Sequence, residues 1–139
     1  VLPVELISFS GKVIDHYRVR VDWTTASENN NDFFTLEQMD TTDEYCDLSI
    51  INGAGTDQNE NYYYFIDEDP LFNSFIYYRL KQTDYDGEST YSYPITVDNR
   101  VYKKEISMKT NVLGQEVNDM YRGVVILVFD DGTTVKIVQ

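Results

Sequence analysis

Apolar and polar side chains alternate along most of the chain. Between residues 16 and 23 the odd positions hold Tyr17, Val19, Val21 and Trp23, and the even positions hold polar or charged residues. Successive side chains of a β-strand point to opposite faces, so this pattern predicts a strand with one buried and one exposed face. The same alternation is present at residues 76–81. We find no convincing amphipathic helix, which would need apolar residues at a period of 3.6.

Further segments have the composition of strands and are separated by residues typical of turns. These predicted strands are 4–10, 33–38, 47–52, 61–66, 90–97, 102–109, 111–117, 123–129 and 133–138. Asn52-Gly53-Ala54-Gly55, Asp86-Gly87 and Asp131-Gly132 supply residues that tolerate positive φ. Many short strands with turns between them predict an all-β fold, an antiparallel β-sandwich.

The negative charge of the chain is confined to its first part. Residues 1–100 hold 19 acidic and 6 basic side chains, a net charge of −13, whereas residues 101–139 hold 5 of each. We therefore predict a sandwich in residues 1–100 and a small C-terminal β-sheet segment in residues 101–139, docked on or beside it. The acidic first part argues against nucleic acid and anionic membranes as partners.

The apolar runs and the first residues of the chain indicate whether it contains a membrane helix or a signal peptide. No apolar run approaches the roughly 20 residues that a membrane helix needs. Val1-Leu2-Pro3-Val4 has neither an initiator methionine nor the basic start of a signal peptide, so we expect the chain to be part of a longer protein.

Few residues suit catalysis. The one histidine, His16, falls on the polar face of a predicted strand, and the one cysteine, Cys46, is expected to be buried and inert. Paired carboxylates could serve a glycosidase, but the candidates lie at strand ends and turns, where aspartate is common for backbone reasons. These candidates are Asp67, Glu68, Asp69, Asp84 and Asp86. We predict no enzymatic activity and no cofactor.

Two binding alternatives stay open. Residues 84–88 resemble the start of a calcium loop, but Ile95 stands where the twelfth-position glutamate would be, so we expect a hairpin turn there. Weak calcium binding by several acidic loops is still an alternative. The tyrosines and Trp23 could also bind a glycan, although Trp23 continues a buried face. We expect Tyr63 and Tyr77 to lie on the face opposite the core.

Three stretches of the first 100 residues resemble a known family. They are Leu2-Pro3-Val4-Glu5-Leu6-Ile7-Ser8-Phe9, Trp23-Thr24-Thr25-Ala26-Ser27-Glu28, and Tyr77-Tyr78-Arg79-Leu80-Lys81-Gln82-Thr83-Asp84-Tyr85-Asp86-Gly87. In order and spacing they resemble fibronectin type III-like modules of proteins exported by the type IX secretion system. The resemblance implies an immunoglobulin-like or fibronectin III-like sandwich.

The last residues resemble the second half of a C-terminal sorting domain of the same cargo proteins. Residues 111–117 look like its penultimate hairpin, and residues 121–126 and 131–139 look like its closing strands. The usual early Asn-Pro turn is absent, so the domain is a shortened variant.

The resemblance implies that the chain is a non-catalytic module that directs a secreted or cell-surface protein through the periplasm and across the outer membrane. Its partners would be the upstream cargo, the outer-membrane translocon and its shuttle protein. We assign recognition to residues of the segment 101–139: Leu113, Gly114, Gln115, Glu116, Arg122, Gly123, Lys136, Ile137, Val138 and Gln139. A terminal strand edge could pair with the partner, or an apolar patch could dock on it. The alternative function is a carbohydrate-binding or adhesion module.

Overall fold

The computed structural model describes residues 4–15, 17–100 and 106–139. All regular structure in these residues is β-strand, and every pair of neighbouring strands is antiparallel. The predicted all-β, antiparallel class is therefore confirmed. The chain forms two compact units, Val1–Asn99 and Arg100–Gln139.

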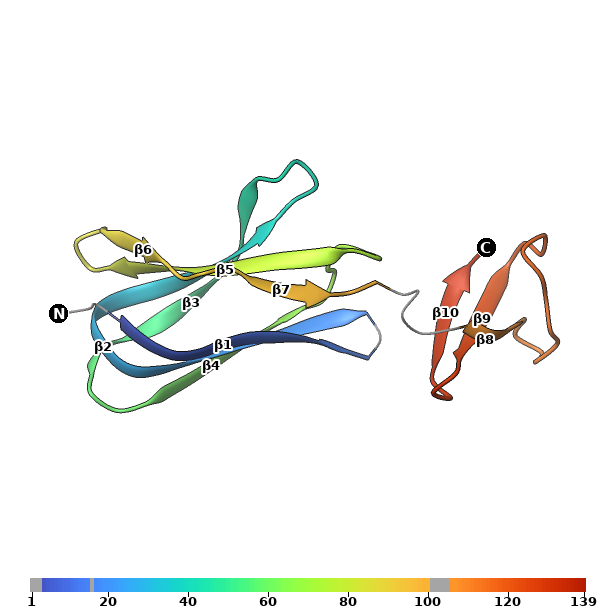
Figure 1. Cartoon of the computed structure of the whole chain (residues 1–139), viewed down its shortest axis with the longest axis horizontal. Helices are drawn as coiled ribbons and strands as arrows, with labels where there is room; N and C mark the ends of the chain where they lie inside the picture. Colours follow the sequence, from blue (N-terminus) through green and yellow to red (C-terminus); the bar gives the residue numbers. More distant parts are fainter. Residues whose placement is uncertain (1–3, 16, 101–105) are drawn as a thin grey trace. The chain divides into compact units, whose positions relative to one another are not determined.

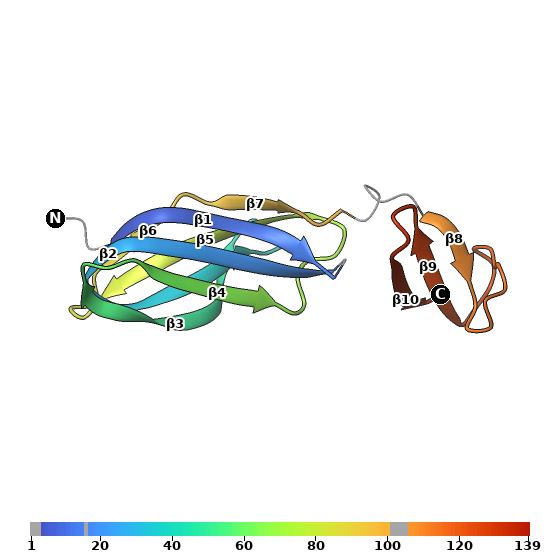
Figure 2. The ribbon, with the colours of Figure 1, turned by 90° about the horizontal axis from the view of Figure 1, so that it is seen from below.

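The described residues of the first unit form seven strands, which Figures 1 and 2 draw. They are β1 (Val4–Ile14), β2 (Arg18–Met39), β3 (Tyr45–Asp57), β4 (Asn61–Asp67), β5 (Phe75–Asp84), β6 (Ser89–Tyr91) and β7 (Ile95–Asp98). The alternation seen in the sequence decides which side chains enter the core. Val19, Val21 and Trp23 on β2 are buried, whereas the residues between them are half-buried.

Strand β2 belongs to both layers of the sandwich. Its first part pairs with β1 and β4, and its second part pairs with β3 and β5. The change of partners falls between Glu28 and Asn31, where the register with β3 shifts and Asn30 has a φ of 53°. One strand thus forms the centre of two layers that pack face to face, which is the architecture of a β-sandwich (Figure 2).

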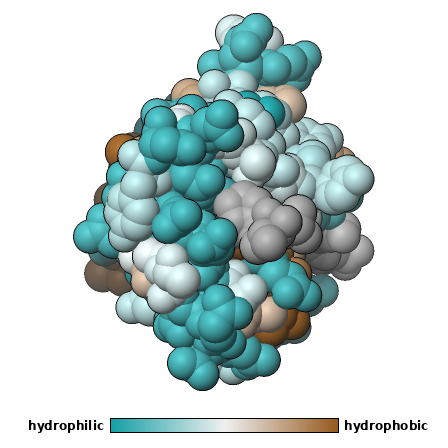
Figure 3. All heavy atoms as spheres, turned by 90° about the vertical axis from the view of Figure 1, so that its left-hand side faces the viewer, coloured by the Kyte–Doolittle hydropathy of each residue, from teal (hydrophilic) through white to brown (hydrophobic). Residues whose placement is uncertain are grey.

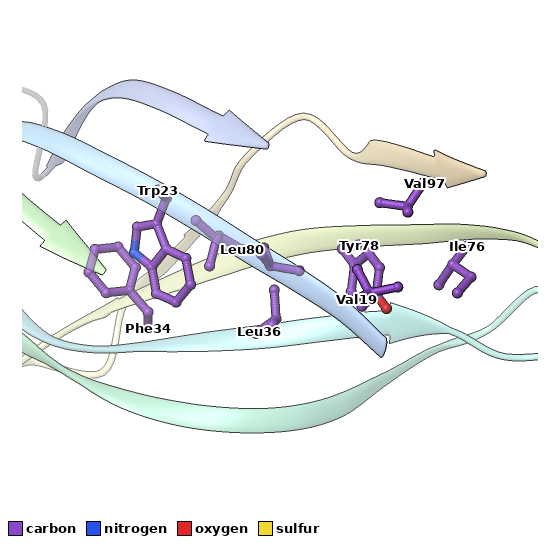
Figure 4. Close-up of a cluster of buried hydrophobic side chains, with 9 residues drawn as sticks. Val19, Trp23, Phe34, Leu36, Ile76, Tyr78, Leu80 and Val97 are labelled. Carbon is purple, nitrogen blue, oxygen red and sulfur yellow. The ribbon is translucent and has the colours of Figure 1, made fainter. Parts of the chain in front are cut away.

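The core fills the space between the two layers (Figure 4). Its buried side chains are Val19, Val21, Trp23, Phe34, Leu36, Ile76, Tyr78, Leu80 and Val97. Burying one such side chain stabilises the fold by about 1.5–3 kcal/mol, so this cluster supplies most of the driving force for folding. The surface at the end of the sandwich in Figure 3 is mainly hydrophilic, as the acidic composition predicts.

A buried polar cluster lies where β2 crosses between the layers. Glu28 is 1% exposed, and its two carboxylate oxygens accept four hydrogen bonds. The donors are Thr25 Oγ1 (3.0 Å), Asn31 Nδ2 (2.6 Å), the Ala54 backbone N–H (3.0 Å) and Tyr63 OH (2.6 Å). We call these five residues the crossing cluster. It joins β2 to both β3 and β4, so it holds the two layers together at this end.

Gly53 on β3 approaches the crossing cluster closely. A Cβ atom at this position would lie 2.5–2.8 Å from the side chain and the backbone oxygen of Asn31. We expect Gly53→Ala to lower the free energy of unfolding of the sandwich by about 2 kcal/mol, because Asn31 cannot move without losing its bond to Glu28. Urea unfolding followed by the fluorescence of Trp23 measures this. Ser10→Ala, at an exposed site on β1, is the control. Equal stability of the two variants would show that β3 can shift freely.

Residues 106–139, the part of the second unit that the structure describes beyond Arg100, form a three-stranded sheet. It holds β8 (Ile106–Thr110), β9 (Val124–Phe129) and β10 (Thr134–Val138) in the order β10-β9-β8. The predicted hairpin at residues 130–132 is confirmed: Gly132 has a φ of 83° and its N–H donates to Phe129 O. Of the strand predicted at 102–109, residues 102–105 lie outside the described part of the chain.

The single strand predicted at 90–97 is two strands, β6 and β7, separated by residues 92–94. Two further predictions about strands are wrong. Residues 111–117 form a turn followed by one isolated bridge, Thr110 with Glu116, because Asn111 Oδ1 accepts hydrogen bonds from two backbone N–H groups of the turn. Residues 52–55 do not separate strands but lie within β3. Gly55 there has a φ of 71°, and the register with β2 shifts on either side of its partner Asn31.

Tyr17, expected on the buried face of the strand predicted at residues 16–23, is 50% exposed and precedes β2. Two further predictions about burial are also wrong. Cys46 is exposed near the start of β3, where its thiol donates to Gln38 O at 3.3 Å. Tyr63 points inward and packs against the core, and its neighbours Tyr62 and Tyr64 are exposed instead. Tyr77 is exposed, as predicted.

Candidate functional site

The residues assigned to recognition lie in three segments of the second unit. Residues 113–116 form the turn after β8, Arg122 and Gly123 immediately precede β9, and residues 136–139 include the end of β10. Because the three strands are antiparallel, all three segments fall toward the end of the sheet where β9 begins. We call this the β9-start end.

Backbone and side-chain hydrogen bonds bring two of these segments together. Gly123 and Gln139 each donate a backbone N–H to the other's carbonyl, at 3.0 and 2.9 Å. The side-chain amide of Gln139 also donates to Asn118 O (2.8 Å) and Tyr121 O (2.9 Å). The Arg122 guanidinium donates to Asp119 O at 2.8 Å. Gln139 thus ties the loop before β9 to the end of β10.

The turn at residues 113–116 is shaped by Asn111. Its Oδ1 accepts the N–H groups of Leu113 and Gln115, each at 3.0 Å. Gly114 has a φ of 81°, a conformation that favours glycine, and donates its N–H to Asn111 O. The Leu113 side chain is 80% exposed. Among the described residues, no hydrogen bond joins this turn to Arg122 or Gln139. The turn therefore lies at the same end of the sheet but outside the hydrogen-bond network of Gln139.

The sequence did not single out three further features of the β9-start end. Val112 and Met120 are exposed and add to the apolar surface of Leu113. Lys109 forms an ion pair with Asp119, and this hydrogen bond lowers the pKa of the Asp119 carboxyl. Lys109 Nζ also lies 3.4 Å from Gln139 Oε1. The end therefore combines exposed apolar side chains with a small polar network.

The strand β10 carries the remaining assigned residues. Ile137 pairs with Val125, Lys136 with Ile126, and Val138 with Val124. Paired residues of an antiparallel ladder share a face, so Lys136 and Val138 lie on one face and Ile137 on the other. Val138 is 83% exposed.

The tyrosines considered for glycan binding differ in their neighbours and in their exposure to solvent. Arg79 lies between the rings of Tyr45 (3.9 Å to the ring centroid) and Tyr91 (4.2 Å), and its guanidinium is 2.5 Å from a Glu37 carboxylate oxygen. Arg20 lies 4.4 Å from the ring centroid of Tyr64. These rings already have cationic neighbours, whereas Tyr93 is 93% exposed.

Two inward-facing tyrosines, one half-buried and one buried, have a raised pKa. Desolvation, together with a hydrogen bond to Glu28, raises the pKa of Tyr63 well above its usual range. Desolvation, together with a hydrogen bond to Asp67 at 2.7 Å, raises the pKa of Tyr78 in the same way. Both hydroxyls therefore act as donors that satisfy buried carboxylates.

Four of the five carboxylates considered for catalysis, all except that of the exposed Asp69, have structural partners among the described residues. Asp67 accepts from Tyr78, and Glu68 pairs with Arg18 at 3.3 Å. The Asp84 carboxylate accepts from the Gln82 side-chain amide at 2.5 Å, and the Asp86 carboxylate accepts from the Glu88 backbone N–H at 2.9 Å. The Gly87 N–H donates to Asp84 O and closes the turn between β5 and β6. The predicted hairpin turn there is confirmed. His16 lies outside the described residues.

Neither a metal site nor a relative indicates the function. Within residues 4–15, 17–100 and 106–139, no three His, Cys, Asp or Glu side chains are grouped so that they could hold a metal ion. The same residues include no helix long and apolar enough to span a membrane. Comparisons with protein families, curated proteins and solved structures find no match to this chain.

Proposed function

We propose that the chain is a non-catalytic export module, in which residues 101–139 direct a cargo protein across the outer membrane by the type IX secretion system. The first unit, a fibronectin III-like sandwich in this proposal, separates the signal from the upstream cargo. The exported protein is secreted or held at the cell surface. The partners of the signal are the outer-membrane translocon and its shuttle protein.

One observation carries the proposal. The residues assigned to recognition lie toward one end of a sheet in the second unit, which is compact by itself. Exposed apolar side chains gather at that end, and the segment 101–139 has no net charge, in contrast to the acidic sandwich. A neutral surface of this kind offers a receptor a target that the rest of the chain does not resemble.

A glycan-binding or adhesion module is the second candidate function. It is favoured by the exposed tyrosines, among them Tyr62, Tyr64 and Tyr93. Exposed aromatic rings can stack on the apolar face of a sugar. This candidate requires residues 1–100 and not the second unit.

Export of a reporter tests the proposal. A fluorescent protein preceded by a signal peptide is fused to residues 1–139, 1–100 or 101–139 and expressed in a bacterium that has the system. We expect the two fusions that contain residues 101–139 to reach the medium or the cell surface, and the 1–100 fusion to stay in the periplasm. Retention of the 1–139 fusion in the periplasm would contradict the proposal and turn attention to glycan binding.

Matched point variants locate the signal within the 1–139 fusion. Leu113→Ser changes an exposed apolar side chain at the β9-start end. Asp130→Ser changes an exposed residue at the opposite end of the sheet. We expect the first variant to reduce export about tenfold and the second to leave it unchanged, since apolar anchors dominate docking surfaces. Equal export by both variants would remove the β9-start end from recognition.

A further inference from the structure

The outer edge of β10 offers unpaired backbone groups. Among the described residues, β10 pairs with β9 alone. Gly123 and Gln139 exchange two backbone hydrogen bonds. In an antiparallel pair every second residue is hydrogen-bonded to the partner strand, so on β10 the residues bonded to β9 are Ile137 and Val135. The N–H and C=O groups of Thr134, Lys136 and Val138 therefore point away from β9.

Among the described residues of the second unit, the two edges of the sheet differ. At the opposite edge of the same sheet, Lys109 O accepts the Val117 N–H at 2.9 Å, so the returning chain covers part of β8. The register of β10 runs without a shift over all five residues, and the strand contains no proline. Such an edge is suited to receive another strand.

The charge of β10 argues against a second copy of this chain as that strand. Lys136 is the one charged residue of β10 and stands at its centre. If two copies paired antiparallel about a two-fold axis at this point, the two Lys136 side chains would lie directly opposite each other. Like charges in this position destabilise a strand pair, whereas a carboxylate opposite Lys136 would stabilise it.

We propose that the outer edge of β10 receives an extended strand of the export machinery, with a carboxylate opposite Lys136 and uncharged neighbours opposite Thr134 and Val138. The inference rests on the proposed export function and specifies how the signal is bound. The main-chain hydrogen bonds of the added strand supply affinity, and the carboxylate supplies register and selectivity.

Proline at an outward-facing position tests the strand addition. Lys136→Pro removes an N–H that makes no bond to β9, so an edge strand tolerates it. Lys136→Ala, the matched control, removes the same side chain and keeps the N–H. In the 1–139 reporter fusion we expect Lys136→Pro to be exported about tenfold less than Lys136→Ala. Equal export of the two variants would overturn the inference.

The charge is tested in the same fusion. We expect Lys136→Glu to be exported less than Lys136→Ala, because it places a second carboxylate opposite the first. Equal or better export of Lys136→Glu would overturn the assigned carboxylate. Sedimentation velocity of the purified chain tests whether a second copy of the chain pairs with β10 instead. A monomer agrees with the proposal. A dimer that Lys136→Pro dissociates would overturn it.

Two controls keep the result specific. Circular dichroism of the purified variants reports whether the second unit still folds, and Val138→Pro, at the end of the strand, replaces Lys136→Pro if that variant unfolds. If the unmodified 1–139 fusion stays in the periplasm, the proposed function fails. If it is exported and the proline variants, still folded, match their alanine controls, only the strand-addition inference fails.

Discussion

Replacing Glu28 with alanine is expected to lower the free energy of unfolding of the sandwich by about 4 kcal/mol, because it leaves buried hydrogen-bond donors without an acceptor. Thr25, Asn31, the Ala54 N–H and Tyr63 all donate to the Glu28 carboxylate. Nothing else in the crossing cluster can accept all four bonds. Urea unfolding followed by Trp23 fluorescence measures the change, since Trp23 is the only tryptophan and lies in the first unit.

Two variants separate the crossing cluster from a general effect of removing a carboxylate. Glu5→Ala, at an exposed position of β1, is expected to change stability by less than about 0.5 kcal/mol. Glu28→Gln keeps one carbonyl oxygen as an acceptor, so its loss is expected to fall between those of the two alanine variants. A Glu28→Ala protein as stable as Glu5→Ala would show that water replaces the carboxylate at no cost.

Trp23→Ala is expected to lower the free energy of unfolding by about 4 kcal/mol, because it opens a large cavity in the core. The Trp23 ring is 1% exposed. It stacks on Tyr63 with ring centroids 5.5 Å apart and meets the edge of Phe34 at 5.7 Å. Since the variant has no tryptophan, circular dichroism during urea unfolding measures the change.

The indole N–H of Trp23 makes a second comparison informative. This buried Nε1 has no hydrogen-bond partner among the described residues. Trp23→Phe keeps an aromatic ring beside Tyr63 and removes the unpaired donor, so its loss is expected to be only about 1–2 kcal/mol. Tyr93→Ala, at a fully solvated ring, is the control and should be near neutral. A loss as large for Trp23→Phe as for Trp23→Ala would contradict this account.

The alternation of side chains was enough to predict the class of the fold and most strands. It was not enough to predict that β2 is one strand of 22 residues. Local sequence around residues 28–32 is polar and rich in asparagine, which is typical of a loop. In the structure Glu28 and Asn31 are buried because they bond to Ala54 and Gln82, which are distant in sequence. Hydrogen bonds between residues this far apart in the chain leave no pattern in the local sequence.

The wrong burial predictions for Tyr63 and Cys46 have the same cause, because burial depends on contacts between distant residues. Tyr62, Tyr63 and Tyr64 are chemically identical, so the sequence does not say which ring faces inward. The register of β4 with β2 decides it, by placing Tyr63 opposite Trp23. Cys46 is hydrophobic enough for a core, but it lies near the start of β3, outside the core cluster.

For the candidate site, the sequence indicated segments but not their contacts. Gly132 was predicted as a turn residue, and Gly114, Gly123 and Gly132 all have positive φ. The pairing of Gly123 with Gln139 depends on the register of β9 and β10, and the bonds of the Gln139 side chain depend on the path of residues 118–121. Neither follows from the spacing of residues along the chain.

The path of β2 has a mechanical consequence. Each layer of the sandwich has β2 as a central strand, so neither layer can peel away as a separate sheet. The amide of Val21, in one layer, and that of Leu36, in the other, become accessible to hydrogen exchange through the same opening event. A pulling force applied to the chain is likewise carried from one layer to the other through a single continuous backbone. The sandwich therefore resists extension as one cooperative unit.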